Sequence, residues 1–431
     1  METLYGKRGT HLQEKTEGAA DDPLKICILT YRGNPTCGGQ GVYVKRVSTA
    51  LRELGHSVDV ISGPPYPHLD DGVTLRKLAS LDLYNPEDLF RVPSVRELKS
   101  PINLIEWLGV SSGGFPEPLT FSLRAYNFFR NNGHAYDIIH DNQCLGYGLL
   151  GIKALGLPLV ATIHHPITVD RDVEVEAERK SWKKLKVYRW YSFLGMQVRT
   201  SRKISHIITV SEASKKDIGR AFKIHSGKFR VIENGIDTET FHPEPGVKRL
   251  ENRLMVTNSA DTPLKGLRHL LEAVASIRKK RDINLTVIGQ PKKGGVIETL
   301  VRDLDLGNCV TFTSRIEDSE FARYYAEATI AVVPSIYEGF GLPAGEAMAC
   351  GVPVISTTGG ALAEVVGDAG ILVPPGDSKA LKKSILHLLD SPEERERLGK
   401  AGYERVLNNF TWRNTALKVI DVYREAIDAH C

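Results

Sequence analysis

The chain has 431 residues and a formal net charge of +4; 42% of its residues are hydrophobic and 25% are charged. This composition is ordinary for a folded globular protein and argues against a disordered chain, a fibrous chain, or nucleic acid as the main partner. No run of about 18 apolar residues occurs, so we expect no membrane-spanning helix.

Cysteine usage and the N-terminus bear on the cellular setting. The six cysteines are scattered without C-x-x-C spacing, which predicts a reducing, cytoplasmic environment with no disulfide framework and no metal site. Residues 1–23 are polar and lack the apolar core of a signal peptide, so we expect a disordered tail.

From residue 24 onward, short β-rich runs alternate with helical patterns. Strands are predicted at 25–31, 56–62, 137–140, 157–164, 204–210 and 229–235, with helices at 42–54, 118–131, 144–155 and 212–222. Strands that alternate with helices are typical of parallel, doubly wound α/β sheets.

Two segments interrupt this alternation. Residues 64–116 are rich in Pro, Gly and Ser and are interpreted as an insertion between strands, either functional or a variable surface excursion. Residues 179–203 contain nine Lys and Arg interleaved with aromatic residues. Such a segment can bind an anionic membrane surface, but we favour a solvated helix with one core-facing stripe: Val187, Tyr191, Leu194 and Val198.

The same rhythm restarts in the second half of the chain. Strands are predicted at 254–259, 283–289, 309–314, 329–335, 353–358 and 370–375. We therefore expect two α/β domains, 24–240 and 241–410, and a final helix within 411–431 that returns to the N-terminal domain.

The most informative motif lies at residues 334–346. Glu338 and Glu346 stand eight residues apart, and between them lies the turn Gly339-Phe-Gly341, which permits close backbone approach. Pro343 suits the first turn of a helix. A loop that leaves a strand and opens a helix exposes free N–H groups that suit sugar hydroxyls and phosphate oxygens.

This stretch resembles the signature of the retaining nucleotide-sugar glycosyltransferases with the GT-B fold, in family 4 (group 1). Further matching segments are Thr209–Ser211, Asn234–Asp237, Cys350–Ile355, Gly359–Gly360 with Glu364, and Phe410–Trp412. The resemblance covers roughly residues 24–428. It implies two Rossmann-like domains that face each other across a cleft and close over their substrates.

The resemblance also implies roles for single residues. Glu338 would face the donor sugar and Glu346 would bind the donor ribose. The amides of Phe340, Gly341 and Leu342 would hold sugar hydroxyls and diphosphate. No metal and no cofactor would be required, because cations and helix N-termini stabilise the leaving diphosphate.

One departure from the family pattern concerns the cations that hold the diphosphate. The family usually has an Arg and, five residues later, a Lys followed by Gly. Lys265-Gly266 is present, but Ala260 occupies the Arg position, next to Ser259. Ser259 could take part in donor binding, and a replacement cation could be Arg315, Arg32 or Arg171.

In the N-terminal half, the glycine loop and one histidine are candidates. Gly38 and Gly39 match the family's donor-facing double glycine, and His164 matches a histidine that contacts the donor sugar. His140 is a weaker candidate. His165 would point away if the strand continues.

We therefore expect a hexosyltransferase that moves a sugar from a UDP- or GDP-sugar to a glycan, lipid-linked or small-molecule acceptor. Retention of the anomeric configuration is implied by the resemblance. The alternatives are a GT-B sugar-nucleotide epimerase and a non-catalytic subunit that binds a sugar nucleotide. We expect a cytoplasmic location, with peripheral contact at the inner membrane face through 179–203 left open.

Overall fold

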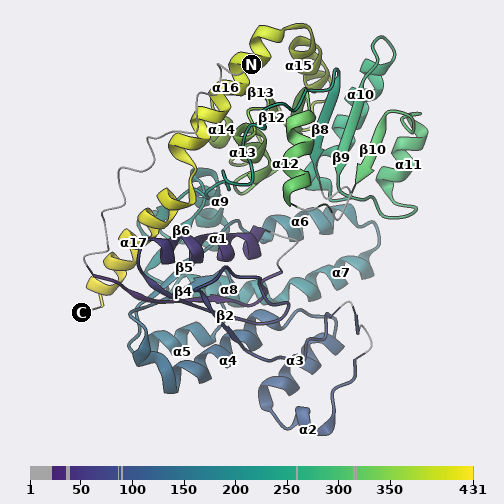
Figure 1. Ribbon diagram of the computed structural model, residues 1–431. Coiled ribbons are helices and arrows are strands. Elements are labelled where there is room, and N and C mark those ends of the chain that lie inside the picture. The colour runs from purple at the N-terminus through teal and green to yellow at the C-terminus, as the bar shows by residue number, and fades with distance from the viewer. Residues whose placement is uncertain are drawn as a thin grey trace. The chain divides into compact units, whose positions relative to one another are not determined.

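The computed structural model describes residues 22–34, 39–85, 87–88, 91–258, 261–313, 316 and 318–430 (Figure 1). The chain divides into two compact units. The C-terminal unit comprises Asn234–Thr411, and the N-terminal unit comprises the described residues up to Glu233 together with those from Trp412 to His430. Among the described residues, no helix combines the length and apolar character needed to cross a membrane.

The N-terminal unit is built on a parallel sheet. Its described residues form seven strands in the order β3-β2-β1-β4-β5-β6-β7. The strands are β1 (Lys25–Thr30), β2 (Ser57–Ser62), β3 (Thr74–Lys77), β4 (Ile138–Asn142), β5 (Leu159–Thr162), β6 (His206–Thr209) and β7 (Phe229–Val231). Every predicted strand of this half is present, with ends that differ by a few residues.

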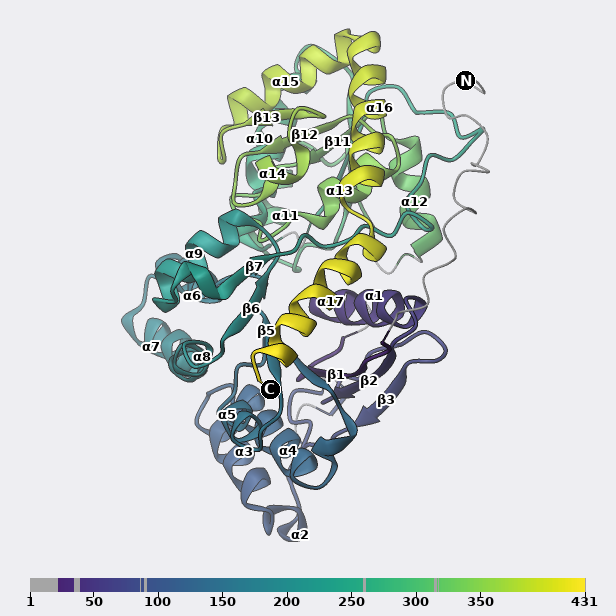
Figure 2. The same cartoon turned by 90° about the vertical axis from the view of Figure 1, so that its left-hand side faces the viewer.

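Helices cover both faces of this sheet. On one face α1 (Gly39–Glu53) lies beside the last helix, α17 (Trp412–Asp428), and both bury apolar side chains in one cluster with β1 and β2 (Figures 1 and 2). The opposite face is covered by α4 (Glu117–Asn132), α5 (Gly148–Ala154) and α9 (Glu212–Phe222). The other helices of this unit are α6 (Thr168–Ala177), α7 (Ser181–Trp190) and α8 (Leu194–Ser201).

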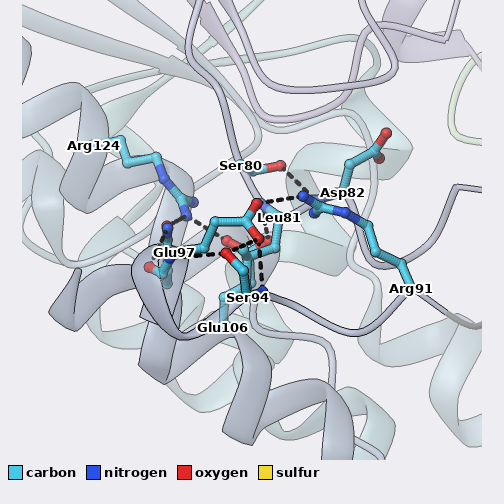
Figure 3. Close-up of polar contacts among 9 residues, drawn as sticks. Ser80, Leu81, Asp82, Arg91, Ser94, Glu97, Glu106 and Arg124 are labelled. Atoms are coloured by element: carbon cyan, nitrogen blue, oxygen red, sulfur yellow. Dashed lines mark hydrogen bonds and ion pairs between the residues drawn. The ribbon is translucent and has the colours of Figure 1, made fainter. Parts of the chain in front are cut away.

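Residues 64–116, which we interpret as an insertion between strands, contain regular structure of their own. They supply the edge strand β3, which pairs in register with β2, and the helices α2 (Val95–Leu98) and α3 (Pro101–Ser111). A largely buried ion pair joins α3 to α4, because Nη2 of Arg124 lies 2.6 Å from Oε2 of Glu106 (Figure 3). Oε1 of Glu106 accepts a hydrogen bond from the Leu81 amide at 3.0 Å.

The C-terminal unit repeats the architecture with a six-stranded parallel sheet in its described residues, ordered β10-β9-β8-β11-β12-β13. The strands are β8 (Arg253–Thr257), β9 (Asn284–Ile288), β10 (Val310–Thr313), β11 (Ile330–Val333), β12 (Val354–Thr357) and β13 (Ile371–Val373). The helices are α10 (Leu267–Arg278), α11 (Val296–Asp303), α12 (Asp318–Glu327), α13 (Leu342–Ala349), α14 (Leu362–Val366), α15 (Ser378–Asp390) and α16 (Pro392–Asn409).

The order of the strands indicates where in each sheet the candidate sites lie. The chain changes direction across the sheet between β1 and β4 in one unit and between β8 and β11 in the other. In open α/β sheets, ligands bind at such switch points, outside the carboxyl ends of the strands. The loops after β8 and β11 carry Lys265 and Glu338, so the topology alone brings those two residues to one edge.

Candidate functional site

The loops after β8 and β11 meet through an ion pair. Nζ of Lys265 lies 2.7 Å from Oε1 of Glu338, and the Ser335 hydroxyl donates to the same oxygen at 2.8 Å. The Lys265 side chain is about one-third exposed and that of Glu338 is largely buried. The structure therefore brings together two residues that lie 73 positions apart in the sequence.

Backbone contacts fix this pair. The Ile336 amide donates to the Leu264 carbonyl at 2.7 Å, so the two loops run against each other. Gly266 follows with φ of 64°, and a Cβ there would lie 2.0 Å from the Pro334 carbonyl oxygen. Only glycine fits this approach, which explains the Lys-Gly dipeptide on structural grounds.

The N-terminus of α13 adds unpaired donors to the same edge. Gly341 precedes the helix with φ of 104° and a Cβ there would meet Leu362. Within the described part of the chain, the amides of Phe340, Gly341 and Leu342 donate no hydrogen bond. Such amides at a helix N-terminus favour an anion. The Phe340 ring is buried and packs edge-on against Phe410 with centroids 5.7 Å apart.

Glu346 lies one turn further along α13 and contacts a tyrosine that the sequence analysis missed. The Tyr325 hydroxyl lies 3.0 Å from Oγ1 of Thr257 and 3.2 Å from the Pro343 carbonyl oxygen, and it interacts with the Glu346 carboxylate. Burial, followed by that carboxylate, raises the pKa of Tyr325 well above its usual value. Tyr325 thus ties the end of β8 to α13 and fixes Glu346.

Neither Ser335 nor Tyr325 carried a sequence signal of its own. Ser335 could have been suspected because it follows β11 and stands three residues before Glu338. Tyr325 sits on α12 in an ordinary helical pattern, and only the packing of α12 shows its role.

In the N-terminal unit, His164 follows β5 at the carboxyl edge of the sheet. Its Nε2 lies 2.8 Å from Oδ1 of Asn142, and since a carbonyl oxygen only accepts, Nε2 carries the proton. Tyr43 packs edge-on against the ring at 4.8 Å. Burial, with smaller contributions from His165 and His140, lowers the pKa of His164 to about 3. The ring is therefore neutral at pH 7 and presents Nδ1 as an acceptor.

The turn after β4 holds His164 in place. Oε1 of Gln143 accepts the His164 amide at 2.8 Å, and its Nε2 donates to the His165 carbonyl at 3.0 Å. Gln143 has φ of 55° and Leu145 has φ of 52°, conformations that are rare outside glycine. Asp141 stabilises this turn by accepting the Leu145 amide at 2.9 Å, and burial raises the pKa of Asp141 to about 7.

The other two histidines considered as candidates, His140 and His165, bond to groups within the protein. His140 is fully buried, with one ring nitrogen 2.6 Å from the Tyr423 hydroxyl and the other 2.7 Å from Oγ1 of Thr162. His165 turns toward Asp170, with 2.8 Å between Nε2 and Oδ2. Neither is available in the way His164 is.

Four of the sequence-derived positions cannot be placed: Gly38, Ser259, Ala260 and Arg315 lie outside the described residues. Gly39 begins α1, and a Cβ there would meet nothing within 4 Å. The close approach falls instead at Gly41, where a Cβ would lie 2.1 Å from the Asn34 carbonyl oxygen. The steric requirement for glycine is thus two residues later than Gly39.

The two remaining candidate cations already have carboxylate partners. Nη1 of Arg32 lies 3.5 Å from Oε2 of Glu117, and Arg171 pairs with Asp172 at 2.7 Å. In the described residues, no group of three or more His, Cys, Asp or Glu side chains is arranged to hold a metal ion.

Among its described residues, the C-terminal unit therefore brings the Lys265 ammonium, the Glu338 carboxylate and the amides that begin α13 to a single sheet edge. An ammonium next to a positive helix end can stabilise negative charge that develops on a departing group. A carboxylate beside them can accept hydrogen bonds from hydroxyl groups. The set suits a ligand that joins a diphosphate to a polyhydroxylated ring.

Comparisons with known proteins agree with this chemistry. Residues 238–405 match the family described as Glycosyl transferases group 1, and residues 37–240 match Glycosyltransferase Family 4. A relative from Mycolicibacterium hassiacum, named MMP alpha-(1->4)-mannosyltransferase, is 47% identical over 94% of this chain and 98% of its own length.

Two more distant similarities cover nearly the whole chain. A D-inositol 3-phosphate glycosyltransferase from Kineococcus radiotolerans is 26% identical over 93% of both chains. The solved structure of a sucrose-phosphate synthase from Thermosynechococcus elongatus superimposes with a TM-score of 0.70 and 26% identity, over 94% of this chain and 100% of that one.

Proposed function

Because the chain belongs to the group 1 glycosyltransferases of family 4, with the GT-B fold, we propose that it moves a mannosyl unit from a nucleoside diphosphate mannose to an acceptor hydroxyl. That it is a hexosyltransferase follows from the family and from the named relatives. The name of the 47% identical relative supports mannose as the sugar and an α-(1→4) linkage. The donor base, UDP or GDP, is left to experiment.

The observation that carries the proposal is the Lys265–Glu338 ion pair beside the free amides of α13. The Lys265 ammonium and the amides of Phe340, Gly341 and Leu342 would bind the diphosphate. Glu338, held by Lys265 and Ser335, would accept a hydrogen bond from a sugar hydroxyl.

The proposed reaction retains the anomeric configuration. The bond between the anomeric carbon and the diphosphate oxygen breaks, and the bond to the acceptor oxygen forms on the same face. The acceptor proton passes to the departing phosphate oxygen, so no enzyme nucleophile is required. Lys265 stabilises the charge on that phosphate. In the N-terminal unit, the neutral His164 can accept a hydrogen bond from a substrate hydroxyl through Nδ1. Glu346, fixed by Tyr325, would bind the ribose.

We further propose that catalysis needs no added metal, because Lys265 and the α13 N-terminus supply positive charge at the diphosphate. Activity that survives treatment with a chelator supports this, and activity that returns only with a divalent cation contradicts it. A cytoplasmic location is part of the proposal and is supported by four buried free cysteines: Cys27, Cys144, Cys309 and Cys350.

A donor and acceptor panel tests the function. The protein is incubated with GDP-mannose, UDP-mannose, UDP-glucose and ADP-glucose, with and without α-(1→4)-linked manno-oligosaccharides, and nucleotide release and product linkage are measured. Nucleotide release with an extended oligosaccharide is expected from one mannose donor. An epimerised donor without acceptor would instead indicate an epimerase, and binding without release would indicate a non-catalytic subunit.

A second acceptor, D-inositol 3-phosphate, is included in the panel. Relatives that are 25–27% identical are named D-inositol 3-phosphate glycosyltransferases. The far higher identity to the mannosyltransferase makes the oligosaccharide the first choice. Turnover on D-inositol 3-phosphate alone would reverse that order.

A further inference from the structure

Helix α3 of the N-terminal unit has its apolar side chains on the outside. Its buried residue is the charged Glu106, 2% exposed and paired with Arg124. Leu104, Ile105 and Leu108 are exposed instead. A helix that only packs on a core shows the opposite arrangement, so this face is suited to contact something outside the folded unit.

Helix α7 repeats the pattern with larger side chains. It buries no residue, and Trp182, Leu185 and Tyr188 are exposed by 54%, 70% and 50%. These three lie at i, i+3 and i+6, so they share one side of the helix. In both views α7 lies at the periphery of its unit (Figures 1 and 2).

The two helices are joined at one corner. The Arg189 guanidinium near the end of α7 donates to the hydroxyl of Ser112, directly after α3. The Trp190 ring stacks on Phe115 with centroids 5.1 Å apart and packs against Tyr84 at 5.4 Å. This aromatic contact fixes the C-terminal end of α7 against the turn after α3.

All charged side chains of α7 itself are basic, whereas α6, which packs beside it, carries Asp170, Asp172, Glu174 and Glu176. Residues 179–203 hold nine Lys and Arg and neither Asp nor Glu. On α7 itself, Nζ of Lys186 lies over the Trp182 ring at 4.7 Å, and Lys183 lies 3.6 Å from the Glu178 carboxylate. An exposed Trp and Leu on a helix flanked by lysines is the pattern of helices that lie in the interface of an anionic bilayer.

We propose that α7, together with the apolar face of α3, is a docking surface for an anionic lipid membrane. Trp182 and Leu185 insert between the headgroups, and the lysines of α7 contact the phosphates. A second copy of the chain is a poorer partner, because two such faces would bring like charges together. The inference is independent of which donor and acceptor the enzyme uses.

Vesicle binding tests this surface with the full chain. Co-sedimentation is measured with phosphatidylcholine vesicles that contain or lack phosphatidylglycerol. The protein should bind the anionic vesicles, and raised salt should release it. The K183Q/K186Q variant should lower the partition coefficient about 30-fold. Its control, K279Q/K280Q, removes two exposed lysines of the C-terminal unit and should bind as the wild type does.

The contribution of apolar side chains to vesicle binding is tested with a second variant and its matched control. The variant Leu185→Ala should weaken binding several-fold, whereas Val296→Ala, at a side chain that is also 70% exposed, should not. Brominated lipids provide a second readout in the unmodified protein. They should quench tryptophan fluorescence in anionic vesicles, and Trp182→Phe should remove most of the quenching.

Several outcomes would overturn the proposal. Equal binding to neutral and anionic vesicles, or none to either, would do so. An unchanged vesicle affinity together with a raised KM for a water-soluble oligosaccharide in the α7 variants would assign the face to a glycan acceptor. A dimer in sedimentation equilibrium that Leu185→Ala dissociates would assign it to a second copy.

Discussion

At the residue scale, the central feature is the ion pair between the Lys265 ammonium and the Glu338 carboxylate at the edge of the C-terminal sheet. Lys265 and Glu338 are partly screened by solvent, so their mutual attraction adds little to stability. Their arrangement is better explained by function, because each holds the other's side chain in a single position. The diphosphate and the sugar hydroxyl would then meet groups that need no further ordering.

The first prediction concerns this pair. Glu338→Ala and Lys265→Ala should each lower kcat by about 10²–10³, because each removes a charge that acts on the reacting groups. The double variant should lose little more than either single one, because the two side chains act as a unit. The measurement is nucleotide release under saturating donor.

The control is a similar ion pair at the surface. Nζ of Lys418 lies 2.7 Å from Oε2 of Glu233, the distance found for Lys265 and Glu338. Glu233→Gln should leave kcat unchanged. Wild-type turnover in Glu338→Ala would contradict the assignment of the site.

The second prediction follows from the pKa of His164 and of His140, both lowered to about 3 by burial. An unfolded chain takes up these protons below about pH 6.5, whereas the folded protein does not until about pH 3. The free energy of unfolding should therefore fall as the pH drops from 7.5 to 5.5. For the fully buried His140 alone the loss is about 1.4 kcal/mol.

Urea unfolding of the wild type and of His140→Gln at pH 7.5 and pH 5.5 gives the free energy of unfolding of each protein. The fall in that free energy between the two pH values is then compared between the two proteins. The variant should be less sensitive to the change in pH. NMR titration of the imidazole protons gives an independent check, and a midpoint near pH 6.5 for either ring would contradict the prediction.

At the scale of elements, the segment 64–116 contains a strand and a helix that the sequence pattern does not predict. β3 has no buried residue and pairs on one side only, so it lacks the apolar run by which the other strands were recognised. α3 buries a glutamate and exposes leucines, which reverses the usual helical pattern. Both elements are held by contacts to distant residues, Ser62 of β2 and Arg124 of α4 among them.

The third prediction is that Glu106→Ala destabilises the protein by about 3 kcal/mol, because Arg124 is left as a largely buried charge with its carboxylate removed. Replacement of both residues by leucine should cost much less. Chemical denaturation measures the difference.

A surface pair serves as the comparison. Glu394→Ala removes the partner of Arg397 on α16, and a change within about 0.5 kcal/mol is expected there. A loss of that small size in Glu106→Ala would show that the ion pair does not anchor α3.

At the scale of the whole molecule, the last helix belongs to the unit that begins the chain. Ala416, Val419, Ile420 and Tyr423 of α17 are buried in the cluster formed with α1, β1 and β2. Oγ1 of Thr415 also donates to the Glu233 carbonyl at 2.8 Å. The N-terminal unit is therefore completed only by residues about 180 positions further along the chain.

The fourth prediction uses this connectivity. A chain of residues 234–411 should unfold cooperatively on its own, because it contains a complete sheet with helices on both faces. A chain of residues 22–233 should be insoluble or unfolded, because the face under α17 is exposed. Addition of 412–430 through a linker should restore folding, as judged by circular dichroism and thermal unfolding.

A cooperative transition in 22–233 alone would contradict this expectation. So would a failure of 234–411 to fold, since that result would mean that the C-terminal unit depends on contacts outside its own sheet.

The sequence by itself determined the two α/β units, nearly all of their strands, and the loop that carries Glu338. Those features follow from local periodicity and from the motif around Glu338, and both are recorded in short stretches of chain. The tertiary structure decided which side chains meet. Only packing could pair Lys265 with Glu338 or place Tyr325 against Glu346. Only the order of the strands could decide that β8 lies beside β11. Contacts between residues far apart in the chain depend on how the elements stack, and no local pattern records that.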